Sequence, residues 1–283
     1  MNEWPTVTES DIKSLNDVSL VLHLASQFLG SAGKCLIVAE PDYSHTSMSW
    51  DGERGWFIGK KLPAKQSLEI ALNVDGMSLL LIDEHRNILS AFDLISETYD
   101  DGIKWLRVVL GEFAVNTRDY VIEMEDDIPD HPVRHGKPFP LFSPGEFSSF
   151  IKVRNLGDQV MKHYAAKFEH ASPVETWPHH FDIGTYIPLV FENGEVTHSI
   201  SLGMAIKDAY VDEHYFYVTH WSKAGAIQYD ELPSLPSLGY WNQKDFTGAI
   251  LKLSDLIKAK NQKEAILGFM GAAIEASKVF MGL

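Results

Sequence analysis

The sequence predicts an α+β fold of antiparallel sheets with flanking helices, arranged as two similar halves. Three observations support this prediction. Short strand-like runs follow one another with hairpin signals between them, helical patterns stand at the ends of each group of strands, and the order helix–strands–helix occurs twice. We therefore expect residues 1–283 to form a single compact unit with an internal duplication, whose halves, near 1–125 and 140–283, are joined by a Pro-rich linker, 126–143.

The first half is expected to begin with a helix. Asp17–Leu29 carries apolar residues at helical spacing, and Gly30 and Gly33 are expected to end it. Cys35, the single cysteine, is predicted to be a buried strand thiol that forms no internal disulfide. A helix over Thr98–Phe113 follows the strands, which are predicted at Lys34–Ala39, Thr46–Trp50, Gly55–Ile58, Ser67–Asn73, Met77–Asp83 and Ile88–Asp93.

The second half repeats this order. A helix is predicted near Pro144–Phe168, and a final helix over Lys263–Phe280. Between them we expect extended segments at Glu175–Val190, Thr197–Ile206, Tyr215–Trp221 and Gly248–Leu253, with Asn193-Gly194 as a hairpin turn. The similar strand-to-helix transitions at Ile88–Ser96 and Ala249–Ile257 are the basis for the expected duplication.

Composition excludes several classes of function. Lys+Arg 24 against Asp+Glu 39 gives a net charge of -15, and no basic stripe reverses it locally, so we expect no nucleic-acid partner. No apolar run approaches the roughly 20 residues of a membrane span, and the N-terminal residues do not resemble a secretory signal, so we expect no membrane partner and a cytoplasmic location. The sequence indicates no particular cofactor and leaves the oligomeric state open.

The densest group of chemically capable residues lies in 172–186. If the chain is extended from His179, alternation places His180 and Asp182 on one face, where a carboxylate could orient an imidazole. We therefore predict His180 and Asp182 as catalytic residues, with Trp177 and His179 beside them as ligand-binding residues. The alternative is that these histidines are structural. Adjacent histidines on a strand point to opposite faces, so no metal site is assigned.

A second group of candidates is aromatic. Tyr217 and Trp221 share one face of the predicted strand Tyr215–Trp221, His220 lies on the other, and Trp241 follows the loop Leu232–Gly239. Such residues can line a small-molecule pocket or form a cross-strand core, and both interpretations stay open. His45 is included as the first-half counterpart of the paired histidines. Nucleophile elbows, phosphate-binding glycine loops and cysteine clusters are missing from the sequence.

Several motifs follow one another along nearly the whole chain. They are His23-Leu-x-x-Gln27, Asp130-His-Pro-Val-x-x-Gly-x-Pro-Phe139, Trp177-Pro-His-His-Phe-Asp-Ile, Ser201-x-Gly, Tyr215-Phe-Tyr-Val-Thr-x-Trp, Leu232-Pro-x-Leu-Pro, Gly239-x-Trp241 and Gly248-Ala-Ile-Leu. This series resembles a bacterial family of uncharacterised proteins, domain of unknown function 5996. The resemblance implies one full-length unit, but it implies no activity or cofactor. One departure is His220, where a proline is expected.

Together, these patterns favour a small-molecule-binding protein or enzyme whose cleft is lined by histidine, aspartate and tryptophan. The alternative is a non-catalytic binding or scaffold protein in which the histidines are structural.

Overall fold

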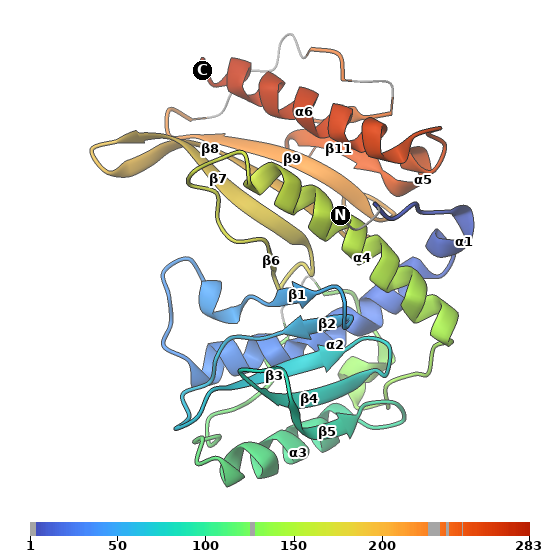
Figure 1. Ribbon diagram of the computed structural model, residues 1–283, viewed down its shortest axis with the longest axis vertical. Helices are drawn as coiled ribbons and strands as arrows, with labels where there is room; N and C mark the ends of the chain where they lie inside the picture. Colours follow the sequence, from blue (N-terminus) through green and yellow to red (C-terminus); the bar gives the residue numbers. More distant parts are fainter. Residues whose placement is uncertain (1–3, 125–127, 226–232, 236–237, 245) are drawn as a thin grey trace. The chain divides into compact units, whose positions relative to one another are not determined.

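The computed structural model describes residues 4–124, 128–225, 233–235, 238–244 and 246–283 (Figure 1). The chain divides into two compact units. Unit 1 consists of Met1–Asn16, Lys152–Val174 and Asp182–Leu283, and unit 2 of Asp17–Ile151 and Glu175–Phe181. Relative to the predicted halves, residues 1–16 of the first belong to unit 1, and residues 140–151 and 175–181 of the second belong to unit 2. Parts of the predicted linker 126–143 and of the loop Leu232–Gly239 lie outside the described residues.

Unit 2 is a five-stranded antiparallel meander with helices. Its strands occur in chain order, β1 (Ser49–Asp51), β2 (Trp56–Ile58), β3 (Leu68–Asn73), β4 (Ser78–Asp83) and β5 (Ile88–Asp93). The long helix α2 (Leu15–Leu36), which begins at the unit boundary, precedes them, and α3 (Tyr99–Glu112) follows (Figure 1). Thr98 caps α3, because its hydroxyl accepts a hydrogen bond from Asp101 N. The short strand β6 (Glu175–Thr176) also belongs to this unit and forms a bridge with Met48.

Unit 1 contains a second antiparallel sheet. Its order is β7 (Ile183–Glu192), β8 (Glu195–Ala205), β9 (Tyr215–Ser222), β11 (Gly248–Lys252) and β10 (Tyr240–Asn242). Asn193 and Gly194 have φ angles of 52° and 84°, the left-handed pair that a two-residue hairpin turn needs, as the Asn-Gly signal predicts. The helices are α1 (Glu9–Ile12), α4 (Pro144–Ala165), α5 (Leu253–Leu256) and α6 (Gln262–Phe280). Of α4, the part from Lys152 onward belongs to unit 1.

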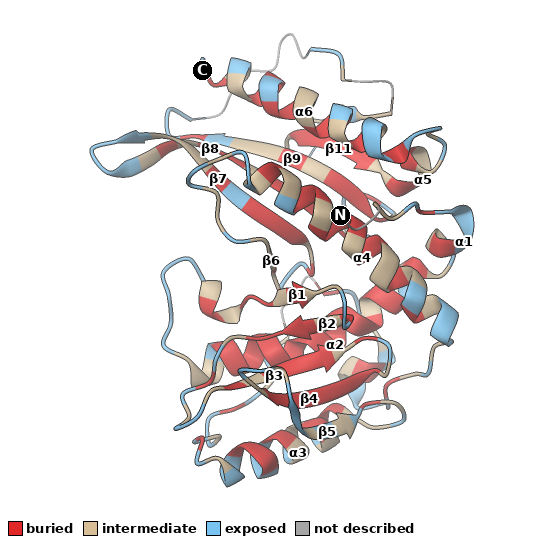
Figure 2. Cartoon of the chain, viewed as in Figure 1, coloured by how far each residue is buried: buried red, intermediate tan, exposed pale blue. Residues whose placement is uncertain are grey.

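The two faces of the unit 1 sheet are covered differently. On the face of Ile183 and Met204, a Cβ at Gly157 of α4 would lie 3.2 Å and 2.8 Å from their side chains, so α4 packs directly on this face. His220, on the same face, contacts Ser277 of α6. The opposite face carries Tyr186 and Trp221, which are 41% and 50% exposed. Figure 2 shows exposed segments along β7 and at the turn between β7 and β8. The first face is therefore core, whereas the opposite face combines a buried cluster around Tyr215 and Ile250 with exposed aromatic rings.

The α+β class with antiparallel sheets and flanking helices is confirmed, whereas the duplication is not. The meander of unit 2 places its strands in chain order, but in unit 1 the strand β10 pairs outside β11, which follows it in sequence. Most predicted strands and all four long helices are present within two or three residues of their expected ends, except that α2 is longer.

The predicted strand Lys34–Ala39 is wrong, because α2 continues through this region to Leu36. Gly30 and Gly33 do not end the helix. They allow close packing instead, since a Cβ at Gly30 would lie 2.7 Å from Pro178 and one at Gly33 would overlap the carbonyl oxygen of His45. Cys35 is accordingly a half-buried helical thiol whose Sγ lies 3.5 Å from the Val121 carbonyl oxygen, rather than a buried strand residue.

Candidate functional site

A short polar contact joins two of the predicted site residues, Asp182 and Tyr217, in unit 1. The Tyr217 hydroxyl donates a hydrogen bond of 2.5 Å to Oδ2 of Asp182. The other carboxylate oxygen, Oδ1, is enclosed and has no hydrogen-bond partner among the described residues. Enclosed polar atoms almost always have partners, so this oxygen marks an incomplete polar site. Burial, the nearby Asp182 charge and this hydrogen bond all raise the pKa of Tyr217 well above its ordinary value, which keeps its hydroxyl protonated.

Two glycines make room for this contact. Tyr217 on β9 pairs with Gly203 on β8, and Gly203 pairs with Gly184 on β7, so the three residues form one row across the sheet. A Cβ at Gly203 would overlap Cζ and the hydroxyl oxygen of Tyr217, and one at Gly184 would lie 3.3 Å from that oxygen. The tyrosine side chain therefore lies flat over both glycines and reaches Asp182, just before the start of β7.

A buried arginine sets the electrostatics of the same unit. Arg154 on α4 is 1% exposed, and burial lowers its pKa to about 9 against the opposing effect of the Asp182 and Asp158 charges. It therefore stays cationic at neutral pH. Asp158 is buried as well, and burial raises its pKa although Lys162, 2.7 Å away, and Arg154 act in the opposite direction. The unit thus holds one buried cation within electrostatic range of two carboxylates.

A second Asp–Tyr pair in unit 1 has a complete set of partners. Oδ2 of Asp208 accepts a hydrogen bond of 2.6 Å from the Tyr215 hydroxyl, and its Oδ1 accepts from the backbone nitrogens of Tyr210 and Val211 at 2.8 Å each. This pair is structural, because it closes the loop before β9. In the Asp182 pair, by comparison, Oδ1 has no such donor among the described residues.

The predicted extended segment Glu175–Val190 is interrupted, and this corrects the proposed alternation. Residues 178–180 form a turn, and β7 begins only at Ile183. Phe181 has a φ of 55°, and its backbone nitrogen donates to the Trp177 carbonyl oxygen at 2.7 Å. His180 therefore lies in the turn and Asp182 just before β7, so the two do not alternate along a regular strand. The prediction that they share one strand face is wrong.

Long-range contacts explain the turn. Within unit 2, the carbonyl oxygen of Pro178 is bonded by Gln27 Nε2 at 2.6 Å and by His23 Nε2 at 2.8 Å. The His23 ring also stacks on the buried Phe181 ring with centroids 5.2 Å apart. The turn is thus anchored to α2 by two residues of the His23-Leu-x-x-Gln27 motif.

The two histidines of this turn lie on the surface of unit 2. His179 and His180 are both exposed, and their ring centroids are 4.4 Å apart. Trp177 lies edge-on to His179 at 6.1 Å. His45, by contrast, is buried, and its Nδ1 accepts a hydrogen bond from Glu40 N, so it supports the turn before β1.

The remaining aromatic candidates lie on opposite faces of the unit 1 sheet. His220 faces α6, where its Nδ1 lies 3.2 Å from Ser277 Oγ, and burial lowers its pKa. Trp241 packs edge-on to Phe280 at 5.5 Å and donates a hydrogen bond to the Pro233 carbonyl oxygen. Trp221 lies on the other, exposed face. His220 and Trp241 thus contribute to packing under α6, and no single cavity can hold all of these side chains.

The sequence analysis missed Arg154, Asp158 and His214. A signal for Arg154 exists, because it falls on the apolar stripe of the helix, four residues after Phe150 and seven before Met161, where a charge needs a buried partner. Among the described residues there is no group of three or more histidine, cysteine, aspartate or glutamate side chains placed to hold a metal ion. Within the same part of the chain, each helix is too short or too polar to traverse a bilayer.

His214 makes unit 1 sensitive to acid. It is 2% exposed, its Nδ1 lies 3.3 Å from Asn16 Oδ1, and burial together with the Arg154 charge lowers its pKa to about 3. A base whose pKa is lower in the folded state than in the unfolded state stabilises the fold fully above the unfolded pKa of about 6.5, and this contribution is lost as the pH falls towards 3.

We expect the free energy of unfolding to fall by about 2–3 kcal/mol more in the wild type than in His214→Gln when the pH is lowered from about 6.5 to about 4.5. Urea unfolding at the two pH values measures this difference. His85→Gln is the matched control for replacing a histidine by glutamine, since His85 is exposed. Equal pH slopes in wild type and His214→Gln would contradict the assignment.

Comparisons of the chain with models of protein families, with curated proteins and with solved structures found no significant match.

Proposed function

We propose that this protein binds a small molecule, and that the ligand donates a hydrogen bond to Oδ1 of Asp182. The observation that carries the proposal is the enclosed Oδ1, which has no partner in the part of the chain that the structure describes, next to an Oδ2 held at 2.5 Å by Tyr217. An enclosed carboxylate oxygen that lacks a hydrogen bond costs on the order of 1–3 kcal/mol, and a ligand N–H or O–H would recover this free energy. The ligand class is therefore an amine, an amide, a ring N–H or a hydroxyl compound.

The charge distribution supports this class. The protein has a net charge of -15, and the site itself offers a carboxylate, so a neutral or cationic ligand fits and nucleic acid does not. A cytoplasmic location and membership of domain of unknown function 5996 remain part of this proposal, the first supported by the single cysteine and the second by the ordered motifs.

A second candidate function, a non-catalytic binding or scaffold protein, is supported by the histidines. His23, His45, His214 and His220 each contact a neighbouring protein group through a ring nitrogen. This arrangement is typical of structural histidines. Asp182 and Tyr217 are thus the residues that separate a ligand-binding function from a purely structural one, and a catalytic role of the exposed His180 stays a prediction.

The test compares ligand binding by variants of the Asp182–Tyr217 pair with ligand binding by variants of the Asp208–Tyr215 pair. A panel of amines, amides, nucleosides and polyols, each near 1 mM, is screened by thermal shift on the wild type, Asp182→Asn and Tyr217→Phe. We expect a ligand that stabilises the wild type, with affinity lowered about tenfold or more in Asp182→Asn, because one charge-assisted hydrogen bond contributes about 1.5–3 kcal/mol. Tyr217→Phe should lower the affinity less, since it leaves Oδ1 in place.

Asp208→Asn and Tyr215→Phe are the matched controls, because they alter the complete pair and should leave ligand affinity unchanged. His180→Ala in the same assay tests its predicted role. Equal ligand binding by the wild type and Asp182→Asn would contradict the proposal, as would a crystal structure in which only an ordered water occupies Oδ1 in the presence of the whole panel.

A further inference from the structure

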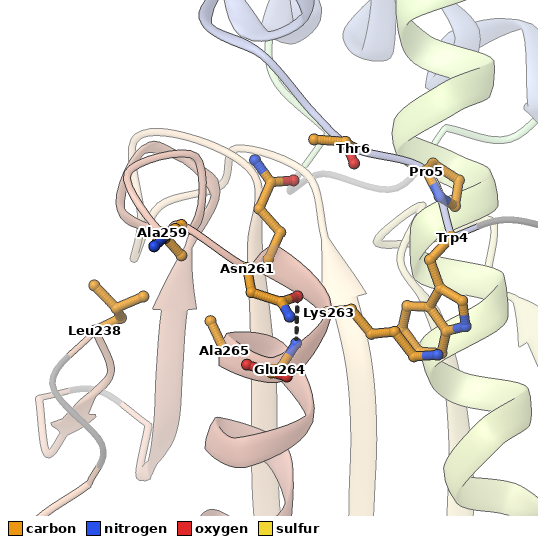
Figure 3. A pocket seen from close by; sticks show the side chains of 11 residues that line it. Trp4, Pro5, Thr6, Leu238, Ala259, Asn261, Lys263, Glu264 and Ala265 are labelled. Carbon is orange, nitrogen blue, oxygen red and sulfur yellow. Dashed lines mark hydrogen bonds between the residues drawn. The ribbon is translucent and has the colours of Figure 1, made fainter.

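A separate groove lies in unit 1, between the N-terminal segment and the start of α6. Its volume is about 910 Å³. Trp4 and Thr6 line it from the N-terminal segment, and Lys263 and Glu264 line it from α6 (Figure 3). Lys260 also belongs to the lining. None of the residues of the Asp182 pair takes part in the lining. A cavity of this size is comparable to the pockets that hold drug-sized ligands.

The wall that carries Trp4 is held in place by a side chain of α6. Gln262 is buried and binds both backbone groups of Val7, with Val7 N donating to Oε1 at 2.9 Å and Nε2 donating to the Val7 carbonyl oxygen at 2.7 Å. Trp4 itself is contacted by Lys263, whose Nζ lies 5.0 Å from the indole centroid, and by the edge of His163 at 6.0 Å. The indole is therefore a fixed surface of the groove rather than part of a loose terminus.

The groove is locally positive in an acidic protein. Among the described residues that line it, there are two lysines, Lys260 and Lys263, and one glutamate, Glu264, a formal charge of +1 where the whole chain carries -15. Beside Trp4, burial and the charges of Lys167 and Lys263 lower the pKa of His163. Asn261 caps α6 through Glu264 N (Figure 3), and the first-turn amides of the helix add to this potential.

We propose that this groove binds a small anionic ligand with a flat apolar body, the anionic group pairing with Lys263 and Lys260 and the body packing against Trp4. Phosphate monoesters and carboxylates share this chemistry, and the lining suits both. Both halves of such a ligand are needed, because a lysine on this partly open surface contributes little affinity alone, and the indole supplies the desolvated contact that strengthens it. The proposal is independent of the Asp182 site.

The experiment is calorimetric titration of the full chain with phenyl phosphate, benzoate, phenol and inorganic phosphate. We expect phenyl phosphate or benzoate to bind, and phenol and inorganic phosphate to bind at least about tenfold more weakly. Whichever of phenyl phosphate and benzoate binds more tightly distinguishes the phosphate class from the carboxylate class. Lys263→Gln should lower the affinity about fivefold to tenfold.

Lys278→Gln is the matched control. Lys278 lies at the other end of α6, outside the lining, and its Nζ stands 5.6 Å from the Phe168 ring, so both substitutions remove one charge and one cation–π contact from the same helix. Its affinity should stay within about twofold of the wild type. Asp182→Asn should bind phenyl phosphate as the wild type does, which separates this groove from the proposed ligand site.

Three outcomes would overturn the proposal: neither anionic compound binds to the wild type, phenol binds as tightly as phenyl phosphate, or the two lysine variants weaken binding equally. Circular dichroism of each variant verifies that it is folded, and Trp4→Leu offers a second probe of the same wall.

Discussion

Replacing Arg154 by methionine is expected to lower the free energy of unfolding by about 3–5 kcal/mol at neutral pH. Methionine fills much of the arginine volume but removes the buried cation that acts on Asp182 and Asp158. The cost arises because carboxylates that lose their opposing charge inside the protein keep their desolvation penalty. Urea unfolding at pH 7 measures the loss. Arg118→Met, at an exposed position, should change stability by less than about 0.5 kcal/mol.

The Arg154→Met deficit should depend on pH. Burial already raises the pKa of Asp158, and losing the arginine raises it further. An acid whose pKa is higher in the folded state destabilises the fold above its unfolded pKa of about 4, and this penalty vanishes at lower pH. The difference in free energy of unfolding between Arg154→Met and the wild type should therefore shrink as the pH falls from 7 towards 4.

A double variant, Arg154→Met with Asp158→Asn, should recover part of the loss, because it removes one of the uncompensated charges. A deficit of equal size at pH 7 and pH 4, with no recovery in the double variant, would show that Arg154 contributes only packing.

Gly203→Ala is expected to destabilise the fold by about 1–3 kcal/mol and to abolish binding at Asp182. The new methyl group overlaps the Tyr217 ring, which must leave its place over β8, so the hydrogen bond to Asp182 is lost. The displaced phenol would lose part of the burial that raises its pKa, and a further tyrosine should ionise near pH 10 in an ultraviolet titration.

The matched control, Gly268→Ala, should change the free energy of unfolding in the opposite direction. Gly268 lies inside α6, and a Cβ there would meet nothing within 4 Å, so Gly268→Ala should stabilise the protein by about 0.5–1 kcal/mol through helix propensity alone. If Gly203→Ala were as stable as the wild type and retained ligand binding, the row of Gly184, Gly203 and Tyr217 would not position the site.

The two corrections to the predicted secondary structure share one physical cause. Glycines at 30 and 33 resemble a helix stop, yet α2 passes through them because Pro178 and His45 lie against that face. A histidine pair before a strand resembles its first residues, yet the chain turns because His23 and Gln27 bind the Pro178 carbonyl oxygen. In both places a contact between residues far apart in sequence outweighs the local preference, and no local pattern contains that information.

Local patterns of the sequence were sufficient for the fold class and for most elements. Period-2 and period-3.6 spacing and turn residues such as Asn193-Gly194 act over a few neighbours, so they can be recognised without knowing what packs where. Strand alternation also places Tyr217 apart from the apolar face of β9, as expected. Asp182, by contrast, was selected because it was expected to share a strand face with His180, and that arrangement is wrong.

The pairing of Asp182 with Tyr217 was decided only by the tertiary structure. It depends on the register that aligns Tyr217, Gly203 and Gly184, and the position of Arg154 on α4 supplies the buried charge beside it. Strand pairing, helix packing and long-range electrostatic interactions act between residues that are tens of positions apart in sequence. Their free energy therefore depends on the assembled three-dimensional arrangement, whereas helix and strand formation is largely set by sequence neighbours.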